Sequence, residues 1–244
     1  MISSTYLRLE LLRTVRNRRF AVLSLGFPLV LYLVFAGPQR NNHDFGGSGI
    51  DAPLYYMVGL AAFGTMSAVL SSGARIAAER SIGWNRQLRL TPLPVSAYFA
   101  AKVITAYALA LITLVVLDLA GTALGVRLSA GRWLEMTALI LVGLIPFAAI
   151  GVFIGHRISV EAIGPAIGGT TALFALLGGT WYPLQDGTLR DIGRDLPSYW
   201  LVQASHISLG GSAWGRHGWL VVAAWTAGFA VLAARAYRND TQRA

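Results

Sequence analysis

Six long apolar stretches run through this sequence, and they restrict what the chain can fold into more than any other feature. The hydrocarbon core of a bilayer is about 30 Å thick, which takes about 20 residues of helix to cross. A segment inside hydrocarbon must be helical, because lipid offers no hydrogen-bond partners to an open backbone. We therefore expect one all-α integral membrane domain over residues 1–244, with six transmembrane helices at about 20–36, 53–74, 95–125, 133–154, 160–181 and 219–234.

Lysine and arginine residues are divided unevenly between the connections of these helices. Fourteen of the twenty fall on one side, which the positive-inside rule places in the cytoplasm. An even number of helices then puts both termini there. Apolar runs separate these residues, whereas nucleic-acid binding is typical of a continuous basic patch, so no nucleic-acid partner is expected. The fourteen are Arg8, Arg13, Arg16, Arg18, Arg19, Arg75, Arg80, Arg86, Arg89, Lys102, Arg157, Arg235, Arg238 and Arg243.

Residues 4–18 precede the first apolar stretch and have the pattern of an amphipathic helix. Leu7 and Leu11 share one face, whereas Glu10 and Arg13 lie opposite. Such a helix lies in the membrane interface, where arginines bind anionic headgroups. A basic segment before an apolar one is also the pattern of a secretory signal peptide. The long basic part and the five further apolar stretches favour the interfacial helix.

The connection between the second and third stretches carries the strongest local motif. It begins with Glu79 and Arg80, is interrupted by Gly83, and stops at Thr91 and Pro92, because proline and the residue before it do not continue a helix. A short, charged, amphipathic helix of this kind can lie on the membrane or dock on a soluble partner. An ordinary solvated loop explains the same residues equally well, so the residues alone leave both interpretations open.

This connection resembles the first coupling region of the type-2 (type V) ABC transporter permeases, a drug and polysaccharide export class. The matching residues, in order, are Glu79, Arg80, Gly83, Leu88, Arg89, Thr91, Pro92, Leu93 and then Lys102. Trp84 departs from the family, which often has a small or polar residue there. The resemblance covers the whole chain. It includes residues 178–184 after the fifth stretch and an outer re-entrant segment at 196–200, between helices 5 and 6.

The resemblance implies that a separate nucleotide-binding ATPase docks on the connection and supplies the energy. The chain has one lysine and no Gly-rich loop before a Lys-Ser or Lys-Thr pair, so it lacks an ATPase's phosphate-binding motif. ATP and magnesium are expected on the partner, and no catalytic residue, cofactor or metal site is expected here. His156 and Arg157 fit either a second contact or simple interfacial charge. The expected docking residues are Glu79, Arg80, Gly83, Trp84, Arg86, Leu88, Arg89, Thr91, Pro92, His156 and Arg157.

In the family, spans two and five line the transport path. Two permeases, identical or homologous, form a twelve-span pore. The substrate implied is an amphipathic drug, antibiotic or lipid, exported across the bacterial plasma membrane. The corresponding path residues are Phe63, Met66, Ser67, Thr170, Thr171 and Phe174.

An intramembrane enzyme and a passive channel or scaffold are the alternative function classes. Ser205 and His206 are adjacent in the sequence, whereas a catalytic Ser–His pair normally joins separated positions. All four histidines lie outside the six stretches, which disfavours a protease or a buried histidine metal site. Asp118 lies inside the third stretch, near its outer end, where a structural hydrogen bond is favoured over a substrate or proton site. Gly151 and Gly155 are spaced for close helix contact, within the chain or at a dimer seam.

Overall fold

The computed structural model describes residues 4–16, 18–84, 87, 90, 91, 94–209 and 213–242. All regular structure in this part of the chain is helical, which confirms the all-α prediction. The elements are α1 Ser4–Arg16, α2 Arg18–Ala36, η1 Phe45–Gly47, α3 Ala52–Leu70, α4 Ser72–Ser81, α6 Val95–Ala123, α7 Ala130–Gly143, α8 Ile145–Arg157, α9 Val160–Leu177, α10 Thr188–Arg194, α11 Pro197–Gln203, η2 Ala204–Leu209 and α12 Arg216–Gln242.

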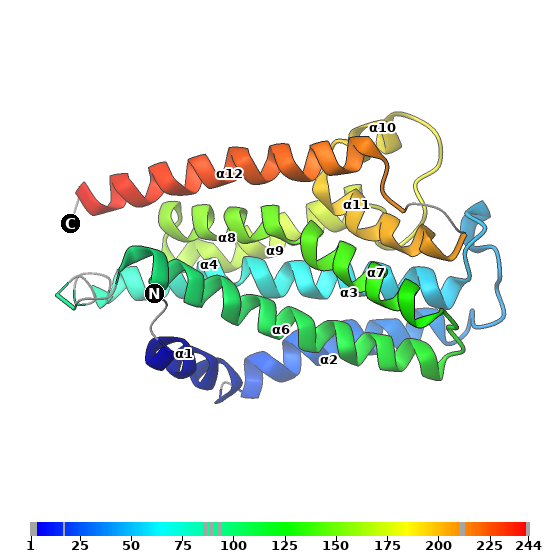
Figure 1. Ribbon diagram of the computed structural model, residues 1–244, viewed down its shortest axis with the longest axis horizontal. Coiled ribbons are helices and arrows are strands. Elements are labelled where there is room, and N and C mark those ends of the chain that lie inside the picture. Colours follow the sequence, from blue (N-terminus) through cyan, green and yellow to red (C-terminus); the bar gives the residue numbers. More distant parts are fainter. Residues whose placement is uncertain are drawn as a thin grey trace.

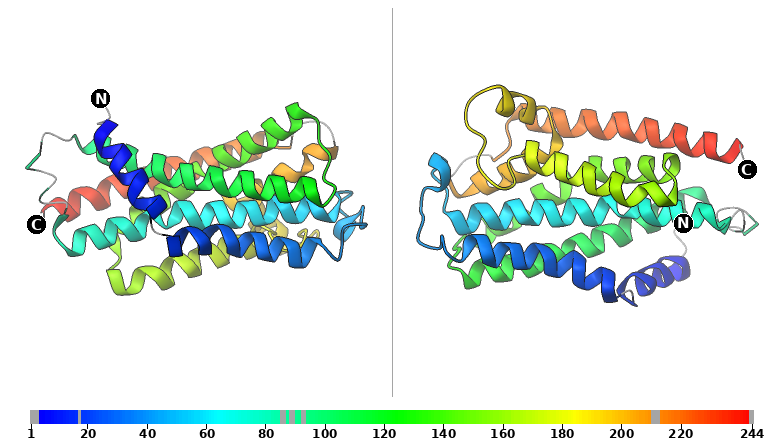
Figure 2. Two further views of the ribbon diagram at one scale, coloured as in Figure 1. Left: turned by 90° about the horizontal axis from the view of Figure 1, so that it is seen from below. Right: turned by 180° about the vertical axis from the view of Figure 1, so that it is seen from behind.

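The long helices form one bundle with two different ends (Figure 1). Helix α1, the end of α4 and the C-terminal end of α12 lie at one end, which we call the basic end. The connection 37–51, helix α10 and the turn after α9 lie at the opposite end, which we call the outer end. Views from two other sides show the same separation (Figure 2). Segments that carry most of the arginines therefore gather at one end of the bundle, as the distribution of charge along the chain predicts.

Helix α3 occupies the middle of the bundle and contacts α2, α6, α8, α9 and α11. Its residues are apolar all round, which is the pattern of a helix without a solvated face. Among the residues that the structure describes, five helical segments are long and apolar enough to cross a membrane: 52–81, 97–123, 130–157, 160–177 and 216–239. The apolar run Leu25–Ala36, within α2, is shorter.

Two of the expected spans are interrupted or shortened. The fourth divides at Leu144 into α7 and α8, because Pro146 has no amide hydrogen to continue the ladder and its ring clashes with the preceding turn. The fifth ends at Leu177, short of the expected Trp181. Gly179 adopts a positive φ of 74° there, the left-handed conformation that commonly closes a helix.

The second expected span is longer than predicted, because α4 continues α3 to Ser81 after a turn at Ser71. Helix α4 packs closely on α8. A Cβ atom on Gly73 would lie 2.3 Å from the carbonyl oxygen of Gly151, and one on Gly155 would lie 2.7 Å from that of Gly73. The pair Gly151 and Gly155 therefore serves packing within the chain, and α3 with α4 forms a continuous rod to the basic end.

The segment after α9 is structured. A short helix, α10, lies between Pro183 and Pro197. The next, α11, begins at Pro197, since proline is well suited to a first helical turn. Helix α11 packs on α3, α7 and α9 and is almost entirely buried.

Candidate functional site

A buried ion cluster ties α1, α4 and α6 together at the basic end of the bundle. The Lys102 ammonium lies 2.6 Å from Oε1 of Glu10 and 2.5 Å from Oε1 of Glu79. The Lys102 side chain is 1% exposed, and those of Glu10 and Glu79 are 5% and 2% exposed. A buried charge is tolerated only when it is paired and hydrogen-bonded, so this geometry holds all three helices in one arrangement.

Tyr98 and Arg13 complete the cluster. The Tyr98 hydroxyl donates to Oε2 of Glu79 over 2.8 Å, and its ring lies 5.3 Å from the Lys102 ammonium. Arg13 places Nη1 3.2 Å from Oε1 of Glu79, although its side chain is 67% exposed. Lys102 and Arg13 thus contact the two carboxylates, and Arg75 is close enough to act on both electrostatically. Glu79 contacts Lys102, Tyr98 and Arg13, whereas Glu10 contacts Lys102.

A second contact joins α1 to α4 beside the cluster. Arg75 donates from Nη1 to the Thr14 hydroxyl over 2.6 Å, and Thr14 donates to the carbonyl oxygen of Glu10 over 2.9 Å. A cavity of about 300 Å³ lies between the two helices and is lined partly by Arg13, Thr14 and Arg75. On the same face of α1, burial raises the pKa of the Tyr6 hydroxyl well above its ordinary value, so Tyr6 stays uncharged at neutral pH.

Arg80 fixes the other side of α4 to the end of α8. Its Nη1 donates to the carbonyl oxygens of Gly155 over 2.8 Å and Ile158 over 3.4 Å. The last carbonyls of a helix lack partners within the helix and carry partial negative charge, so an arginine there satisfies both needs. Helix α4 is consequently held by Arg80 on one side and by Glu79 on the other.

Beyond α4, the structure describes three further residues of the predicted docking segment: Gly83, Trp84 and Thr91. Gly83 adopts a φ of 71° and its amide donates to the Arg80 carbonyl over 3.0 Å, which ends the helix. Trp84 is 38% exposed, and Thr91 is exposed. Four predicted docking residues fall outside the described residues: Arg86, Leu88, Arg89 and Pro92.

The second predicted contact, at the end of α8, is divided between the interior and the surface. His156 is 3% exposed and packs against the rings of Phe99 and Tyr237. Arg157 is exposed. Because Glu79 and His156 are both buried, neither side chain can touch a partner directly. They position the residues beside them. Among the described members of the predicted set, Trp84, Thr91 and Arg157 are exposed at the surface.

The predicted path residues lie on α3 and α9, and their two phenylalanines have different aromatic neighbours. Phe63 packs against Phe27 and Trp181, with ring centroids 6.2 and 5.5 Å away. Phe174 packs instead against Phe147 and Trp225, at 5.1 and 5.6 Å. The two aromatic groups therefore belong to different clusters. Of the others, Met66 and Thr171 are buried, and Ser67 and Thr170 are half-buried.

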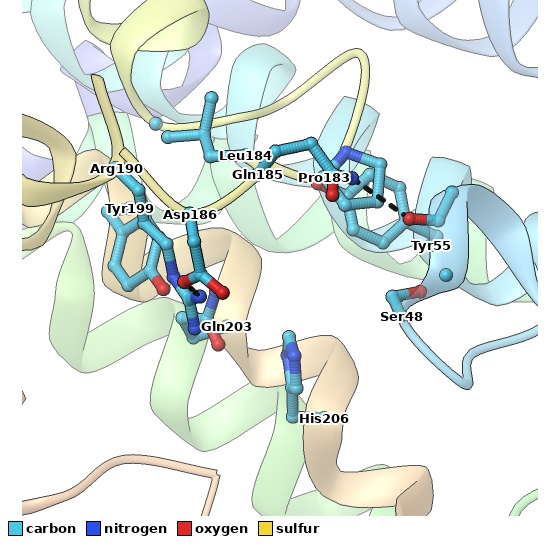
Figure 3. Close-up of a pocket in the computed structure, with 13 residues that line it drawn as sticks. Ser48, Tyr55, Pro183, Leu184, Gln185, Asp186, Arg190, Tyr199, Gln203 and His206 are labelled. Carbon is cyan, nitrogen blue, oxygen red and sulfur yellow. Dashed lines mark hydrogen bonds and ion pairs between the residues drawn. The ribbon is translucent and has the colours of Figure 1, made fainter. Parts of the chain in front are cut away.

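A polar cavity of about 260 Å³ opens at the outer end of the bundle (Figure 3). Asp186, Arg190 and Gln203 group together across from Ser48, and Arg190 forms an ion pair with Asp186. Burial lowers the pKa of His206, which lines the same cavity. This cavity could not be found from the sequence, because the residues that line it come from four segments that are separate along the chain.

The outer Ser–His neighbours do not form a catalytic pair. The Ser205 hydroxyl donates to the carbonyl oxygen of Val202 over 2.8 Å, so it is not directed at an imidazole. Within the described ranges, no group of three or more histidine, aspartate or glutamate residues could hold a metal ion.

Glu10 and Tyr98 are members of the site that were not expected from the sequence, and Lys102 was expected only through the family resemblance. The sequence nevertheless contains an indication that Glu10 and Lys102 pair. Glu10 is the one acidic residue before position 44, and Lys102 is the one lysine of the chain. Isolated charges of opposite sign beside apolar segments favour mutual pairing, because a lone buried charge is costly.

Comparisons with known proteins identify the family of this chain. Residues 4–209 match the family described as ABC-2 type transporter. The chain is similar to a Bacillus subtilis (strain 168) protein named "Putative transport permease YvfS", with 31% identity over 194 residues that cover 78% of each protein. A match over most of the chain shows the family, and the all-helical bundle has the spans that a multi-pass membrane transport subunit needs. The chain therefore belongs to the ABC-2 type transporter family.

Proposed function

We propose that this chain is the permease subunit of an ATP-driven exporter in the bacterial plasma membrane. It crosses the bilayer six times with both termini in the cytoplasm, and α1 lies in the inner interface. A separate ATPase, which carries ATP and magnesium, docks on the connection after α4. The exported substrate is amphipathic: a drug, an antibiotic or a lipid. The observation that carries the proposal is the buried cluster of Glu10, Glu79 and Lys102, which makes the docking end of α4 rigid with α1 and α6.

The path of force follows from these contacts. A partner that pushes on the exposed Trp84 acts on a turn attached directly to α4. Glu79 passes the displacement to α6 through Lys102, and Arg80 passes it to α8 through the Gly155 carbonyl. Helix α4 also continues α3, so the centre of the bundle moves with it. ATP-driven closure of the ATPase then shifts the permease between two arrangements that bind the substrate differently, which is all that transport requires.

A second permease fits against α9. Helix α9 is the fifth expected span, and most of its surface is exposed. Gly164, Gly168 and Gly169 would have no atom within 4 Å of an added Cβ. Small residues on an open face allow another helix to approach closely. Phe63 and Phe174 belong to different clusters within one chain, so a path between them requires the bundle to open or a second copy to complete it.

Co-purification with the ATPase tests the proposal. The tagged full chain, extracted from its native membrane in mild detergent, is expected to retain a subunit with a phosphate-binding loop and ATPase activity. An interfacial tryptophan typically contributes about 2 kcal/mol or more, so Trp84→Ala should weaken the complex about 30-fold. Trp219→Ala is the matched control, because Trp219 is also exposed but lies in the first turn of α12, at the opposite end of that helix from its C-terminus. Loss of the partner in both variants, or no ATPase with the unmodified chain, would refute the proposal.

Topology can be tested separately, because the chain contains no cysteine. His43→Cys places a thiol in the outer connection, and Thr91→Cys places one beyond α4. A membrane-impermeant maleimide should label the first variant in intact cells and the second only after lysis. Labelling of Thr91→Cys in intact cells would overturn the proposed orientation.

A further inference from the structure

A second feature of the bundle surface is an apolar groove between α6, α8 and α12. Its volume is about 460 Å³, within the range of about 300–1,000 Å³ typical of small-molecule sites. Alanines on two helices leave it hollow: Ala148 and Ala149 on α8 face Ala230 and Ala234 on α12. Ala230 and Ala234 are exposed, so the groove opens on the outside of the bundle, toward lipid.

One end of the groove is aromatic and basic. The rings of Phe99, His156 and Tyr237 pack together, with centroid distances of 5.1, 5.5 and 5.8 Å. Arg238 follows on α12 and is the one charged side chain among the described residues that line the groove. Arg157, which directly follows His156, is exposed at the same end of α8. Positive charge is thus concentrated where the apolar lining stops.

The opposite end is apolar, and the length between the two ends corresponds to one leaflet. Thr226 marks the far end, and its hydroxyl donates to the Val222 carbonyl over 2.7 Å, so it presents no unpaired donor to the groove. From Thr226 to Arg238, α12 rises about 18 Å at about 1.5 Å per residue. Half of a hydrocarbon core of about 30 Å is about 15 Å.

We propose that this groove binds one anionic phospholipid, with an acyl chain along the alanines and the phosphate on Arg238. The groove has a cation at the level of the lipid headgroup and then an apolar slot about one leaflet deep. A phospholipid has the same order of groups, with its phosphate followed by its acyl chains. Guanidinium groups bind phosphate through paired, charge-assisted hydrogen bonds. Arg157 adds a second positive charge at the same level, which favours an anionic headgroup over a zwitterionic one. The site rests on the membrane placement of the bundle and not on the identity of the exported substrate.

Lipid retention measures this binding directly. The full chain is reconstituted in nanodiscs with equal amounts of phosphatidylglycerol and phosphatidylcholine, then released gently and analysed by native mass spectrometry. We expect one tightly held phosphatidylglycerol per chain. Equal retention of the two lipids, or none, by the unmodified chain would overturn the proposal without any substitution.

Two pairs of variants locate the site. Arg238→Gln should reduce the preference for phosphatidylglycerol about fivefold, the effect of removing about one interfacial cation. Arg235→Gln is its control, because Arg235 is exposed on the same helix but does not line the groove. Ala230→Phe fills the slot and should release the bound lipid, whereas Ala227→Phe, on an exposed position outside the slot, should not. Equal effects within either pair would refute the assignment.

Discussion

Replacement of Lys102 by methionine tests the central claim that the cluster at the basic end is a buried, paired charge network. The substitution keeps a long unbranched side chain and removes the ammonium. Loss of one partner from a buried ion pair costs about 3–5 kcal/mol, because the other charge remains buried without compensation. We expect a cost in that range, since the Lys102 side chain is 1% exposed and lies against two carboxylates.

The structure also predicts which of the two carboxylates accounts for most of the lost stability. Glu79 keeps Tyr98 and Arg13 after the substitution, whereas Glu10 loses the ammonium that lies 2.6 Å from it and keeps the longer-range attraction of Arg75. Addition of Glu10→Gln to Lys102→Met should therefore recover at least half of the lost stability, and Glu79→Gln should recover less. Arg13→Met is the matched control. Its side chain is 67% exposed, so its loss should cost less than about 1 kcal/mol.

Reversible unfolding in mixed detergent micelles, followed by tryptophan fluorescence, gives the free energies for this double-mutant cycle. Coupling energies of neighbouring residues are measured cleanly only in such a cycle. A cost below about 1 kcal/mol for Lys102→Met would show that water reaches the cluster. Equal rescue by Glu10→Gln and Glu79→Gln would refute the assignment of partners.

Two further predictions concern packing and pH. Gly73→Ala forces a Cβ against the Gly151 carbonyl and should lower the unfolding free energy by about 1–3 kcal/mol; Gly228→Ala, with nothing within 4 Å of its added carbon, should not. His206 is kept neutral by burial, which lowers its pKa in the folded state. Its contribution to stability is therefore complete above the unfolded value of about 6.5 and is lost as the pH falls below it. Amide hydrogen exchange in α11 and η2 should therefore become faster below that pH. His206→Gln should abolish this pH dependence, whereas substitution of the exposed His43 should preserve it. A pH dependence that persists in His206→Gln would contradict the assignment.

The helices themselves follow from the sequence for a simple reason. Long apolar segments have one way to satisfy their backbone in hydrocarbon, so their helical state and approximate positions can be deduced without tertiary information. The breaks are harder to deduce. Pro28 and Pro165 lie inside continuous helices, whereas Pro146 begins a new one. The local sequence alone does not separate these cases, because neighbouring helices decide whether the displaced backbone groups find new partners.

The glycines likewise show which features can be deduced from the sequence and which depend on tertiary structure. The chain has 27 of them, and several are spaced for close helix contact. The structure puts Gly151 and Gly155 against α4, whereas Gly164 and Gly168 face open space. Spacing shows that a close approach is possible, and the arrangement of the helices decides which pairs make one.

The candidate site depended most on tertiary structure. From the sequence, Glu79 and the break at Gly83 could be selected from the motif after the second stretch, and Lys102 only through the family resemblance. Glu10 is 92 residues from Lys102 in the chain, and no local pattern relates them. A buried charge needs an opposite charge beside it, and the isolated charges in the sequence indicate that such pairs must form. Only the packing of α1 against α6 determines that Glu10 is the residue that pairs with Lys102.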